Sequence, residues 1–180
     1  GFTNGNLHGN TLVGNSDAFL MKFNSAGTRQ WTKTVSSDNS DDAYGLAIDS
    51  NNNVYITGYT TGILDGTNAG TWDAFLRKYD SDGAILWTKQ LGSTLQDQAK
   101  GISTDSNNNV YITGFTRGNL DGTSAGTSID AFLTKYNSDG TKLWTKQLGT
   151  ATTSTERAQG VSTDSNNNVY ITGYTSGNLD

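Results

Sequence analysis

The stretch Asp-Ser-Asn-Asn-Asn-Val-Tyr-Ile-Thr-Gly at residues 49–58 recurs unchanged at residues 105–114 and 164–173. Successive copies therefore start 56 and then 59 residues apart. Two other strings keep the same period: Asp-Ala-Phe-Leu-x-Lys-(Phe/Tyr), starting at positions 17, 73 and 130, and Trp-Thr-Lys, starting at positions 31, 87 and 144. Self-similarity at a fixed period is typical of repeat architectures, so the chain is predicted to be one unit repeated about three times.

Each unit divides into four short strands, because β-branched and aromatic residues are enriched between clusters of turn-forming residues. In the second unit the predicted strands are residues 101–104, 110–115, 131–136 and 142–148. The polar loop at 105–109 and the sequence Asn-Ser-Asp-Gly at 137–140 fit hairpin turns, since Asn, Asp and Gly tolerate left-handed backbone geometry. The longer Gly-rich links at 5–16, 62–72 and 118–129 differ between copies and are predicted to be surface loops.

The pattern of these strands favours a β-propeller over other repeat folds. Both faces of the Val-Tyr-Ile-Thr strand are partly apolar, which suits a sheet that lies between two neighbouring sheets. The first strand of each unit carries small residues, including Gly45, Gly101 and Gly160, as expected for the crowded strands around a central axis. Helical solenoids lack support because there is no helical periodicity, and a parallel β-helix is disfavoured because the hairpin turns imply antiparallel pairing.

Counting strands predicts an all-β single repeat domain with about three blades' worth of four-stranded antiparallel sheet. The expected divisions are a partial blade at 1–40, blades at 41–96 and 97–155, and a partial blade at 156–180. Propellers typically close with roughly four to eight blades. We therefore expect the ring to be closed by further blades of a longer chain or by homo-oligomerisation, and the first residues are expected to be internal to a longer chain or processed.

Composition excludes several classes of function. The net charge is -5 and the 12 basic residues are scattered, which argues against a nucleic-acid partner. No apolar run approaches the roughly 20 residues that a membrane-spanning helix needs, so no membrane insertion is expected. With no Cys, a single His at position 8 and no Gly-x-Ser-x-Gly motif, the chain offers no parts for nucleophilic catalysis, and we do not expect an enzyme or a cofactor.

The strand motifs resemble those of the SBBP family, the so-called seven-bladed β-propeller repeat, and more loosely NHL-type blades. They read Gly-Ile-Ser-Thr-Asp at 101–105, Asn-Val-Tyr-Ile-Thr-Gly at 109–114, Asp-Ala-Phe-Leu-Thr-Lys at 130–135 and Leu-Trp-Thr-Lys-Gln-Leu-Gly at 143–149. The first copy departs from this pattern with Val35 and Ser36 in place of Leu-Gly. The resemblance implies a propeller scaffold of the kind found in many bacterial surface and secreted proteins, and it implies no particular activity.

The repeated polar loop is a candidate calcium site, because it places oxygen ligands at alternate positions, as the start of a calcium-binding loop does. Val54 stands where a sharp-turn Gly would be, and no acidic residue closes the loop, so an ordinary hairpin turn is the alternative. The candidate ligands are Asp49, Asn51, Asn53, Asp105, Asn107, Asn109, Asp164, Asn166 and Asn168.

An acidic residue precedes each first-strand Gly by four positions: Asp41, Asp97 and Glu156. These three carboxylates could line one propeller face, ready for a cation or a sugar hydroxyl. The alternatives are a solvated loop charge or a cap on neighbouring backbone amides.

Tryptophans are the other candidates for ligand binding. Trp31, Trp87 and Trp144 recur at blade spacing on the predicted outer strand, where their faces could stack on sugar rings or pack between blades. Trp72 lies in the variable loop of one copy only, which makes it the better candidate for an exposed contact.

Two functions fit these features. The first is a non-catalytic scaffold or interaction module of a secreted or cell-surface protein, expected to be extracellular and bacterial, with a protein partner. The second is a multivalent, lectin-like propeller that binds a glycan at one weak site per blade.

Overall fold

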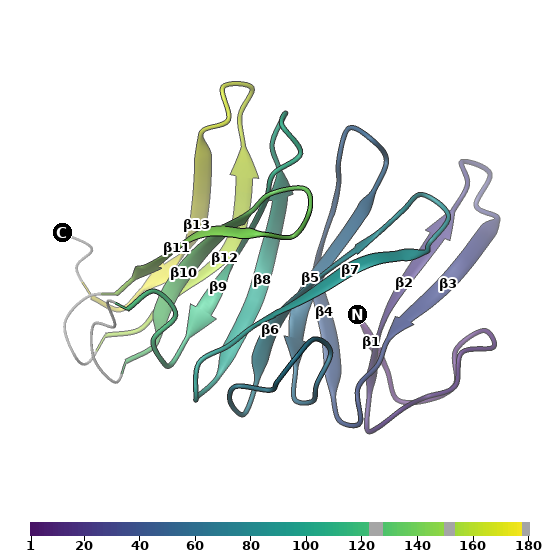
Figure 1. The fold of residues 1–180 in the computed structure, drawn as a ribbon, viewed down its shortest axis with the longest axis horizontal. Coiled ribbons are helices and arrows are strands. Elements are labelled where there is room, and N and C mark those ends of the chain that lie inside the picture. The colour runs from purple at the N-terminus through teal and green to yellow at the C-terminus, as the bar shows by residue number, and fades with distance from the viewer. Residues whose placement is uncertain (123–127, 150–153, 178–180) are drawn as a thin grey trace.

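The structure, a computed structural model, describes residues 1–122, 128–149 and 154–177, and this part of the chain is all-β (Figure 1). The strands are β1 (Phe2–Thr3), β2 (Asp17–Phe23), β3 (Arg29–Val35), β4 (Asp41–Ile48), β5 (Val54–Thr60), β6 (Asp73–Tyr79), β7 (Ile85–Leu91), β8 (Asp97–Thr104), β9 (Val110–Thr116), β10 (Asp130–Tyr136), β11 (Lys142–Leu148), β12 (Glu156–Thr163) and β13 (Val169–Thr175). No helix long and apolar enough to span a membrane occurs in the described ranges.

The strands form four consecutive antiparallel sheets. Two are complete, with the orders β4-β5-β6-β7 and β8-β9-β10-β11, while β1-β2-β3 precedes them and β12-β13 follows. Figure 1 shows the sheets succeeding one another from the purple end to the yellow end of the chain. The predicted all-β fold of four-stranded antiparallel sheets, about three blades' worth, is confirmed.

The first strands of successive sheets lie against one another. A Cβ on Gly45 of β4 would lie 2.9 Å from Ile102 of β8, and one on Gly101 of β8 would lie 3.0 Å from the Cα atom of Gly160 in β12. Backbones can approach this closely only where side chains are absent. The small residues therefore allow β4, β8 and β12 to form the inner side of the arrangement.

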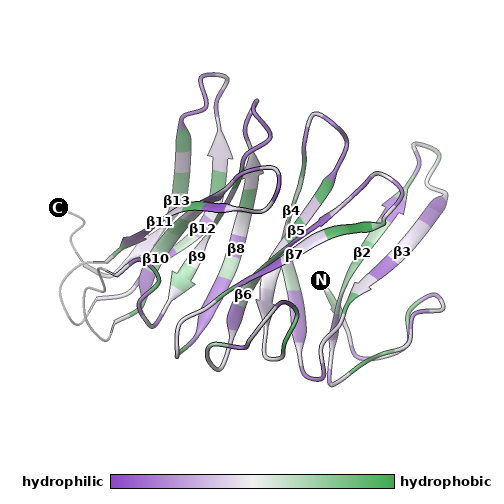
Figure 2. Cartoon of the chain, in the orientation of Figure 1, coloured by the Kyte–Doolittle hydropathy of each residue, from purple (hydrophilic) through white to green (hydrophobic). Residues whose placement is uncertain are grey.

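The apolar core lies between successive sheets rather than inside one of them. Ala74 and Leu91 of the first complete sheet pack with Ala99, Ile112 and Phe132 of the next. Along the strands, apolar and polar residues alternate (Figure 2), as expected when each face of a sheet meets a different neighbour. Burial of this apolar surface between blades is the main favourable contribution to the fold.

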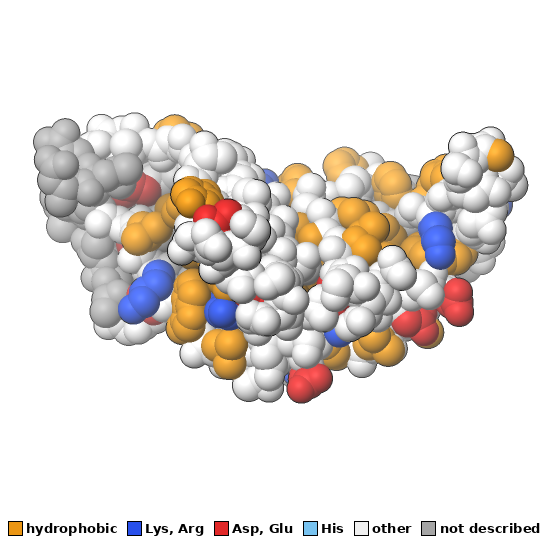
Figure 3. Space-filling model, turned by 90° about the horizontal axis from the view of Figure 1, so that it is seen from above, with side chains coloured by type: hydrophobic (Ala, Val, Ile, Leu, Met, Phe, Trp, Pro, Cys, Tyr) orange, Lys and Arg blue, Asp and Glu red, His pale blue; other side chains and the backbone are white. Residues whose placement is uncertain are grey.

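Seen from above, the molecule is a crescent (Figure 3). The sheet of β1, β2 and β3 lies at one end of it, and the sheet of β12 and β13 lies at the other (Figure 1). The two incomplete sheets are therefore separated by the two complete ones.

Two details differ from the sequence prediction. The first strand of the second unit begins at Asp97, four residues before the predicted start at Gly101, with a β-bulge between Ala99 and Gly101. The bulge interrupts the regular alternation on which the prediction rested. In addition, Phe2 and Thr3 form the short strand β1, which was not predicted and which pairs with β2.

Candidate functional site

The aspartate of the repeated polar loop holds that loop together. Asp105 Oδ1 accepts hydrogen bonds from the backbone N–H groups of Asn107 and Asn109, at 2.9 and 2.8 Å. Its Oδ2 accepts from the Asn109 side-chain amide at 2.8 Å and from the Tyr111 hydroxyl at 3.0 Å. The Lys135 ammonium lies 3.8 Å from the same oxygen. The same four hydrogen bonds recur at Asp49 and Asp164.

This environment sets the charge of the aspartate. Burial alone would raise the pKa of the Asp105 carboxyl, but the hydrogen bonds from Asn109, Tyr111 and Asn107 together lower that pKa below its ordinary value. The carboxylate is therefore ionised at neutral pH, and both of its oxygens are occupied by donors.

The same loops also join neighbouring blades. Asn108 has a φ of 60°, a left-handed conformation that Asn tolerates. Its Oδ1 accepts hydrogen bonds from the backbone N–H and the hydroxyl of Ser50, in the loop of the preceding sheet, at 3.1 and 2.9 Å. Asn167 accepts equivalent bonds from Ser106. The Asp-Ser-Asn-Asn-Asn string is thus accounted for by turn formation and blade-to-blade contact.

The residues proposed as calcium ligands all lie in these loops. Asn51, Asn107 and Asn166 contribute backbone N–H donors, and Asn53, Asn109 and Asn168 contribute both backbone and side-chain donors, to the aspartate of their own loop. A cation would have to displace these donors. Over the described ranges, no three His, Cys, Asp or Glu side chains come together as a metal site.

The three acidic residues at the starts of the first strands are buried, so the interpretation as solvated loop charges is wrong. Asp41 and Asp97 have no exposed surface, and Glu156 is 2% exposed. Asp97 Oδ2 accepts from the backbone N–H and the hydroxyl of Ser93 at 2.6 and 2.8 Å. Burial raises the pKa of Asp97 in spite of hydrogen bonds from Thr116 and Ser93. The carboxylate acts as a cap on the incoming loop, which was the other alternative.

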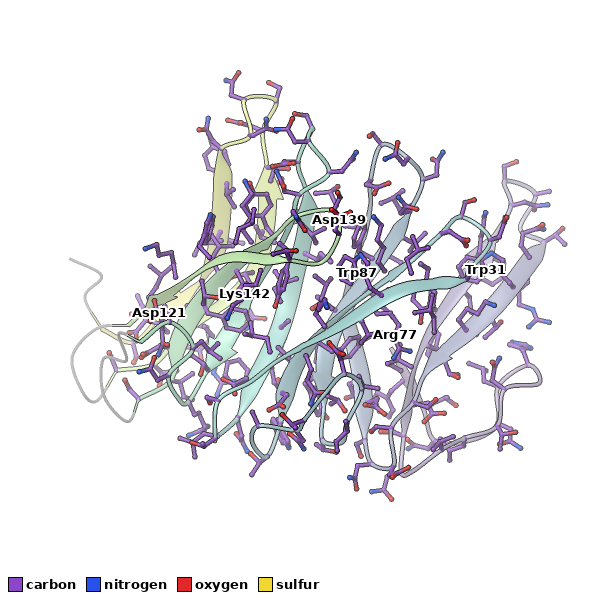
Figure 4. All side chains as sticks on the ribbon, in the orientation of Figure 1. Trp31, Arg77, Trp87, Asp121, Asp139 and Lys142 are labelled. Carbon is purple, nitrogen blue, oxygen red and sulfur yellow. The ribbon has the colours of Figure 1, made fainter. Side chains whose placement is uncertain are left out.

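The repeated tryptophans lie between blades. The Trp87 indole N–H donates to the backbone oxygen of Ser138, in the turn of the next sheet, at 3.1 Å. Two Trp87 ring atoms lie 3.0 and 3.1 Å from where a Cβ of Gly140 would be, so the ring is covered by that turn. Figure 4 shows Trp87 beside the turn that carries Asp139. The Trp31 ring lies against the Cβ position of Gly83 in the same way. Among the described residues no turn covers Trp144, which is 36% exposed.

Trp72 belongs to a different group of side chains, which we call the aromatic patch: Tyr44, Tyr59 and Trp72. Their rings are stacked in a row, with centroids 6.0 Å apart for Tyr44 and Tyr59 and 5.0 Å apart for Tyr59 and Trp72. The residues come from β4, from β5 and from the position just before β6, so the row crosses one sheet. Tyr44 is 47% exposed and Trp72 is partly exposed, which leaves an accessible aromatic surface.

Charged groups adjoin the aromatic patch. Asp42 Oδ2 accepts from the hydroxyls of Tyr59 and Tyr44 at 3.2 and 3.4 Å, and the Lys100 ammonium lies 3.5 Å from the centre of the Tyr44 ring. Burial, together with the nearby Asp42 carboxylate, raises the pKa of Tyr59 to about 12. Burial also lowers the pKa of Lys100. The patch thus combines flat apolar faces with one buried carboxylate and one ammonium group, an arrangement that suits a ligand with both apolar and polar surface.

Sequence reasoning found Trp72 but missed the rest of the patch. The missed signal is the variation between copies that are otherwise nearly identical. Position 42 and its equivalents hold Asp, Gln and Arg, and position 44 and its equivalents hold Tyr, Lys and Gln. The Asp-Ser-Asn-Asn-Asn loops and the outer tryptophans, in contrast, do not change. Residues that the blade framework requires are repeated in every copy. Positions 42 and 44 and their equivalents lie at one end of the inner strands and vary, so they are free to serve another role.

Comparison with known proteins agrees with this architecture. A family of β-propeller repeats, SBBP, matches residues 30–65, 86–121 and 143–180. The chain is 29% identical over 162 residues to the regulatory protein FlaEY of Caulobacter vibrioides, which covers 81% of this chain and 17% of that protein. It is 30% identical over 187 residues to an uncharacterized WD repeat-containing protein of Acanthamoeba polyphaga mimivirus, which covers 82% of this chain and 13% of that protein.

The chain therefore spans less than a fifth of the length of either of these relatives. The repeat matches, in contrast, cover more than half of the chain, and they include the polar loops and outer strands described above. On this basis the chain belongs to the SBBP family of β-propeller repeats.

Proposed function

We propose that this chain is a non-catalytic interaction module of a secreted or cell-surface protein, and that it holds a protein partner at the aromatic patch. The observation that carries the proposal is the make-up of the patch and its place at positions that differ between the repeats. It combines three stacked aromatic rings with Asp42 and Lys100 at positions that vary between otherwise nearly identical repeats. Tyr and Trp dominate the energetics of protein interfaces because they offer large, rigid surface with a polar tip.

The comparisons support an interaction role in general terms. One relative is named a regulatory protein and the other a WD repeat-containing protein, and propeller repeats in general form rigid platforms for binding. Location outside the cell rests on the sequence alone, on the absence of Cys and on the acidic, Asn/Thr/Ser-rich composition.

The test compares three forms of the chain: wild type, the double variant Tyr44→Ala/Trp72→Ala, and Leu86→Ala as a control. Leu86 is an exposed apolar residue on the outer strand β7, away from the patch. Each immobilised form is exposed to the extracellular fraction of the source cells, and captured proteins are then purified and titrated by calorimetry. We expect a partner that binds the wild type and Leu86→Ala and loses at least tenfold in affinity for the double variant. Equal affinity for all three folded forms would contradict the proposal.

A glycan ligand is the second candidate, and the exposed faces of Tyr44 and Trp72 beside Asp42 and Lys100 favour it, because sugars combine stacking faces with hydroxyls. A glycan array distinguishes a single glycan site at the patch from one weak glycan site per blade. Binding that disappears in Trp72→Ala supports a single site at the patch. Binding that disappears only when Trp31, Trp87 and Trp144 are replaced together, in a folded chain, supports one weak site per blade.

A further inference from the structure

The side chain of Lys100, in the inner strand β8, reaches back over the preceding sheet. Its ammonium nitrogen lies 3.5 Å from the centre of the Tyr44 ring in β4. The two strands are close enough for this contact, because a Cβ on Gly45 of β4 would lie 2.9 Å from Ile102 of β8. A cation over the face of an aromatic ring is attracted by the ring electrons, so Lys100 is held at one end of the aromatic patch.

Arg157 repeats this arrangement one sheet further along. Its guanidinium carbon lies 4.0 Å from the centre of the Phe115 ring, although Phe115 belongs to β9 and Arg157 to β12. The inner strands are again in contact, since a Cβ on Gly101 of β8 would lie 3.0 Å from the Cα atom of Gly160 in β12. The two cations therefore lie at the same end of neighbouring inner strands, each on a ring of the sheet before it.

Neither cation has an ion-pair partner within the part of the chain that the structure describes. No carboxylate oxygen there lies within 4.0 Å of Lys100 or Arg157, and neither side chain donates a hydrogen bond to a described residue. The Nε atom of Arg157 is buried without a hydrogen-bond partner. Lys78, in contrast, donates to the backbone oxygen of Ser138 at 2.9 Å. Charged donors that are half-buried and unpaired cost free energy, which an acceptor from outside the chain would recover.

The charges around Lys100 favour an anion there. Burial lowers the pKa of the Lys100 ammonium, and the charge of Arg157 lowers that pKa further. Asp42 raises the same pKa, but its effect is smaller than that of Arg157. Oδ2 of Asp42 already accepts hydrogen bonds from the hydroxyls of Tyr44 and Tyr59. An anion beside Lys100 and Arg157 would relieve their mutual repulsion.

The two cations are not part of the repeated framework. The positions equivalent to Lys100 hold Tyr44 and Gln159, neither of which is charged. The positions equivalent to Arg157 hold an acidic residue and an amide. The chain as a whole has a net charge of -5, yet it keeps these two cations unpaired at neighbouring positions. Blade packing does not require them, so they are available for a ligand.

The site lies inside the described crescent. Lys100 is at the junction between the two complete blades, and Arg157 is at the next junction. By analogy with these two contacts, an inner strand that followed β12 would reach back over Gln159 and Tyr174. Such a strand would not cover Lys100 or Arg157. The argument is therefore the same whatever precedes or follows these repeats.

We propose that Lys100 and Arg157 bind a carboxylate side chain of the protein partner, whose neighbouring apolar side chain packs on the aromatic patch. This inference rests on the proposed function and names the chemistry of the partner, an acidic segment with an apolar residue. The guanidinium fork matches a carboxylate, and the ammonium adds a compact charge. In an extended segment, side chains two residues apart lie about 7 Å from each other on the same side. That spacing is close to the 6.0 Å between the Tyr44 and Tyr59 rings.

The placement of Lys100 favours a protein segment over an acidic sugar. The ammonium group already lies over one face of Tyr44, and a sugar ring needs such a face for stacking. The row of rings continues from β4 across β5 to Trp72, just before β6, which suits several side chains in succession.

Two synthetic peptides serve as probes: acetyl-Gly-Glu-Trp-Glu-Gly-amide and its uncharged counterpart with Gln in place of Glu. Each is titrated by calorimetry against wild type, Lys100→Gln/Arg157→Gln and the control Lys142→Gln/Lys146→Gln. The control removes the same two charges from exposed positions on the outer strand β11. The acidic peptide should bind wild type and the control about tenfold or more tightly than it binds the Lys100→Gln/Arg157→Gln variant.

The uncharged peptide should bind wild type more weakly than the acidic peptide does. Equal binding of the acidic peptide to all three folded forms would overturn the proposal, as would equal binding of the two peptides or no binding at millimolar concentration. Neither cation has an ion pair to lose, so the double variant is expected to fold, as checked by circular dichroism. Lys100→Gln alone provides the same comparison with a single change.

Trigalacturonate is the acidic sugar probe. It should bind wild type more weakly than the acidic peptide. Tighter binding of trigalacturonate, lost in Lys100→Gln/Arg157→Gln, would assign the site to a glycan carboxylate and overturn the assignment to a protein segment.

A partner captured on the wild-type chain separates this inference from the proposed function. We expect its affinity to fall about tenfold or more in Lys100→Gln/Arg157→Gln as well as in Tyr44→Ala/Trp72→Ala. A loss in the aromatic variant alone would overturn the carboxylate site and leave the proposed function in place. A loss in the cation variant alone would support the carboxylate site and contradict binding at the aromatic patch.

Discussion

At the scale of single residues, hydrogen bonds to one carboxylate explain why the polar loop has the same sequence in each copy. Asp105 accepts four hydrogen bonds, and each of its donors is a residue of the repeated string. The Asp and Asn residues of this string predicted a turn, but their composition did not distinguish an ordinary hairpin turn from a calcium-binding loop. Only the positions of the donors show that both carboxylate oxygens are occupied.

Replacing this carboxylate by an amide should destabilise the fold. In Asp105→Asn, the new NH₂ group would face the donors Asn109 Nδ2 and Tyr111 OH, so two hydrogen bonds are lost inside a half-buried loop. We expect a loss of about 2 kcal/mol in the free energy of unfolding, measured by urea titration. Asp82→Asn, in an exposed turn, is the matched control and should change stability by less than about 0.5 kcal/mol. Equal effects of the two substitutions would contradict this role of Asp105.

Calcium should have no effect on these loops. A cation could bind Asp105 only by displacing amide and hydroxyl donors that already satisfy it. The melting temperature should therefore be the same in millimolar calcium and in chelator, as followed by circular dichroism. An increase of several degrees with calcium would restore the metal interpretation.

Stability should depend on pH in two opposed steps. The pKa of Asp97 is raised, mainly by burial, so the folded state binds that proton more readily and gains stability as pH falls through this pKa. The pKa values of Asp49 and Asp105 are lowered, so their contribution is full above the unfolded value of about 3.9 and is lost as pH falls through the folded values.

Urea unfolding from pH 7 to pH 2.5 should therefore show a rise in stability in mildly acidic solution, followed by a fall below about pH 4. Asp97→Asn should diminish the rise, and Asp105→Asn should diminish the fall. A steady decrease from pH 7 in the wild type would contradict the opposed shifts.

At the scale of elements, the strands and turns followed from the sequence, while the contacts between blades did not. Alternation and turn chemistry located 110–115, 131–136 and 142–148 to within a residue of β9, β10 and β11. The burial of Asp97 and the stacking of Tyr59 on Trp72 depend on how strand ends and neighbouring loops meet, and local periodicity carries no information about that. The aromatic patch was missed for the same reason.

The turn glycines show how blades depend on each other. In Gly140→Ala the new Cβ would lie 3.0 Å from the Trp87 ring, in addition to the strain of an L-residue at a φ of 82°. Gly66→Ala carries the same strain, at a φ of 77°, with no atom within 4 Å. We expect a cost of about 1 kcal/mol for Gly66→Ala and about 2 kcal/mol more for Gly140→Ala, measured by thermal or urea unfolding. Similar costs for the two variants would indicate that the turn does not pack on Trp87.

At the scale of the whole molecule, the described residues form an open crescent of consecutive sheets. Two complete blades and two smaller sheets follow one another along it, and apolar side chains pack between the two complete blades. From the sequence, the phase of the repeat predicted incomplete blades, but it did not show which side chains pack between successive sheets.

Small-angle X-ray scattering of the purified chain tests this account most directly, because the curve reports how the sheets are arranged in solution. The account predicts the scattering of a rigid crescent, in which successive sheets pack side by side with β4, β8 and β12 on the inner side. The scattering of a flexible string of sheets that move independently would contradict it.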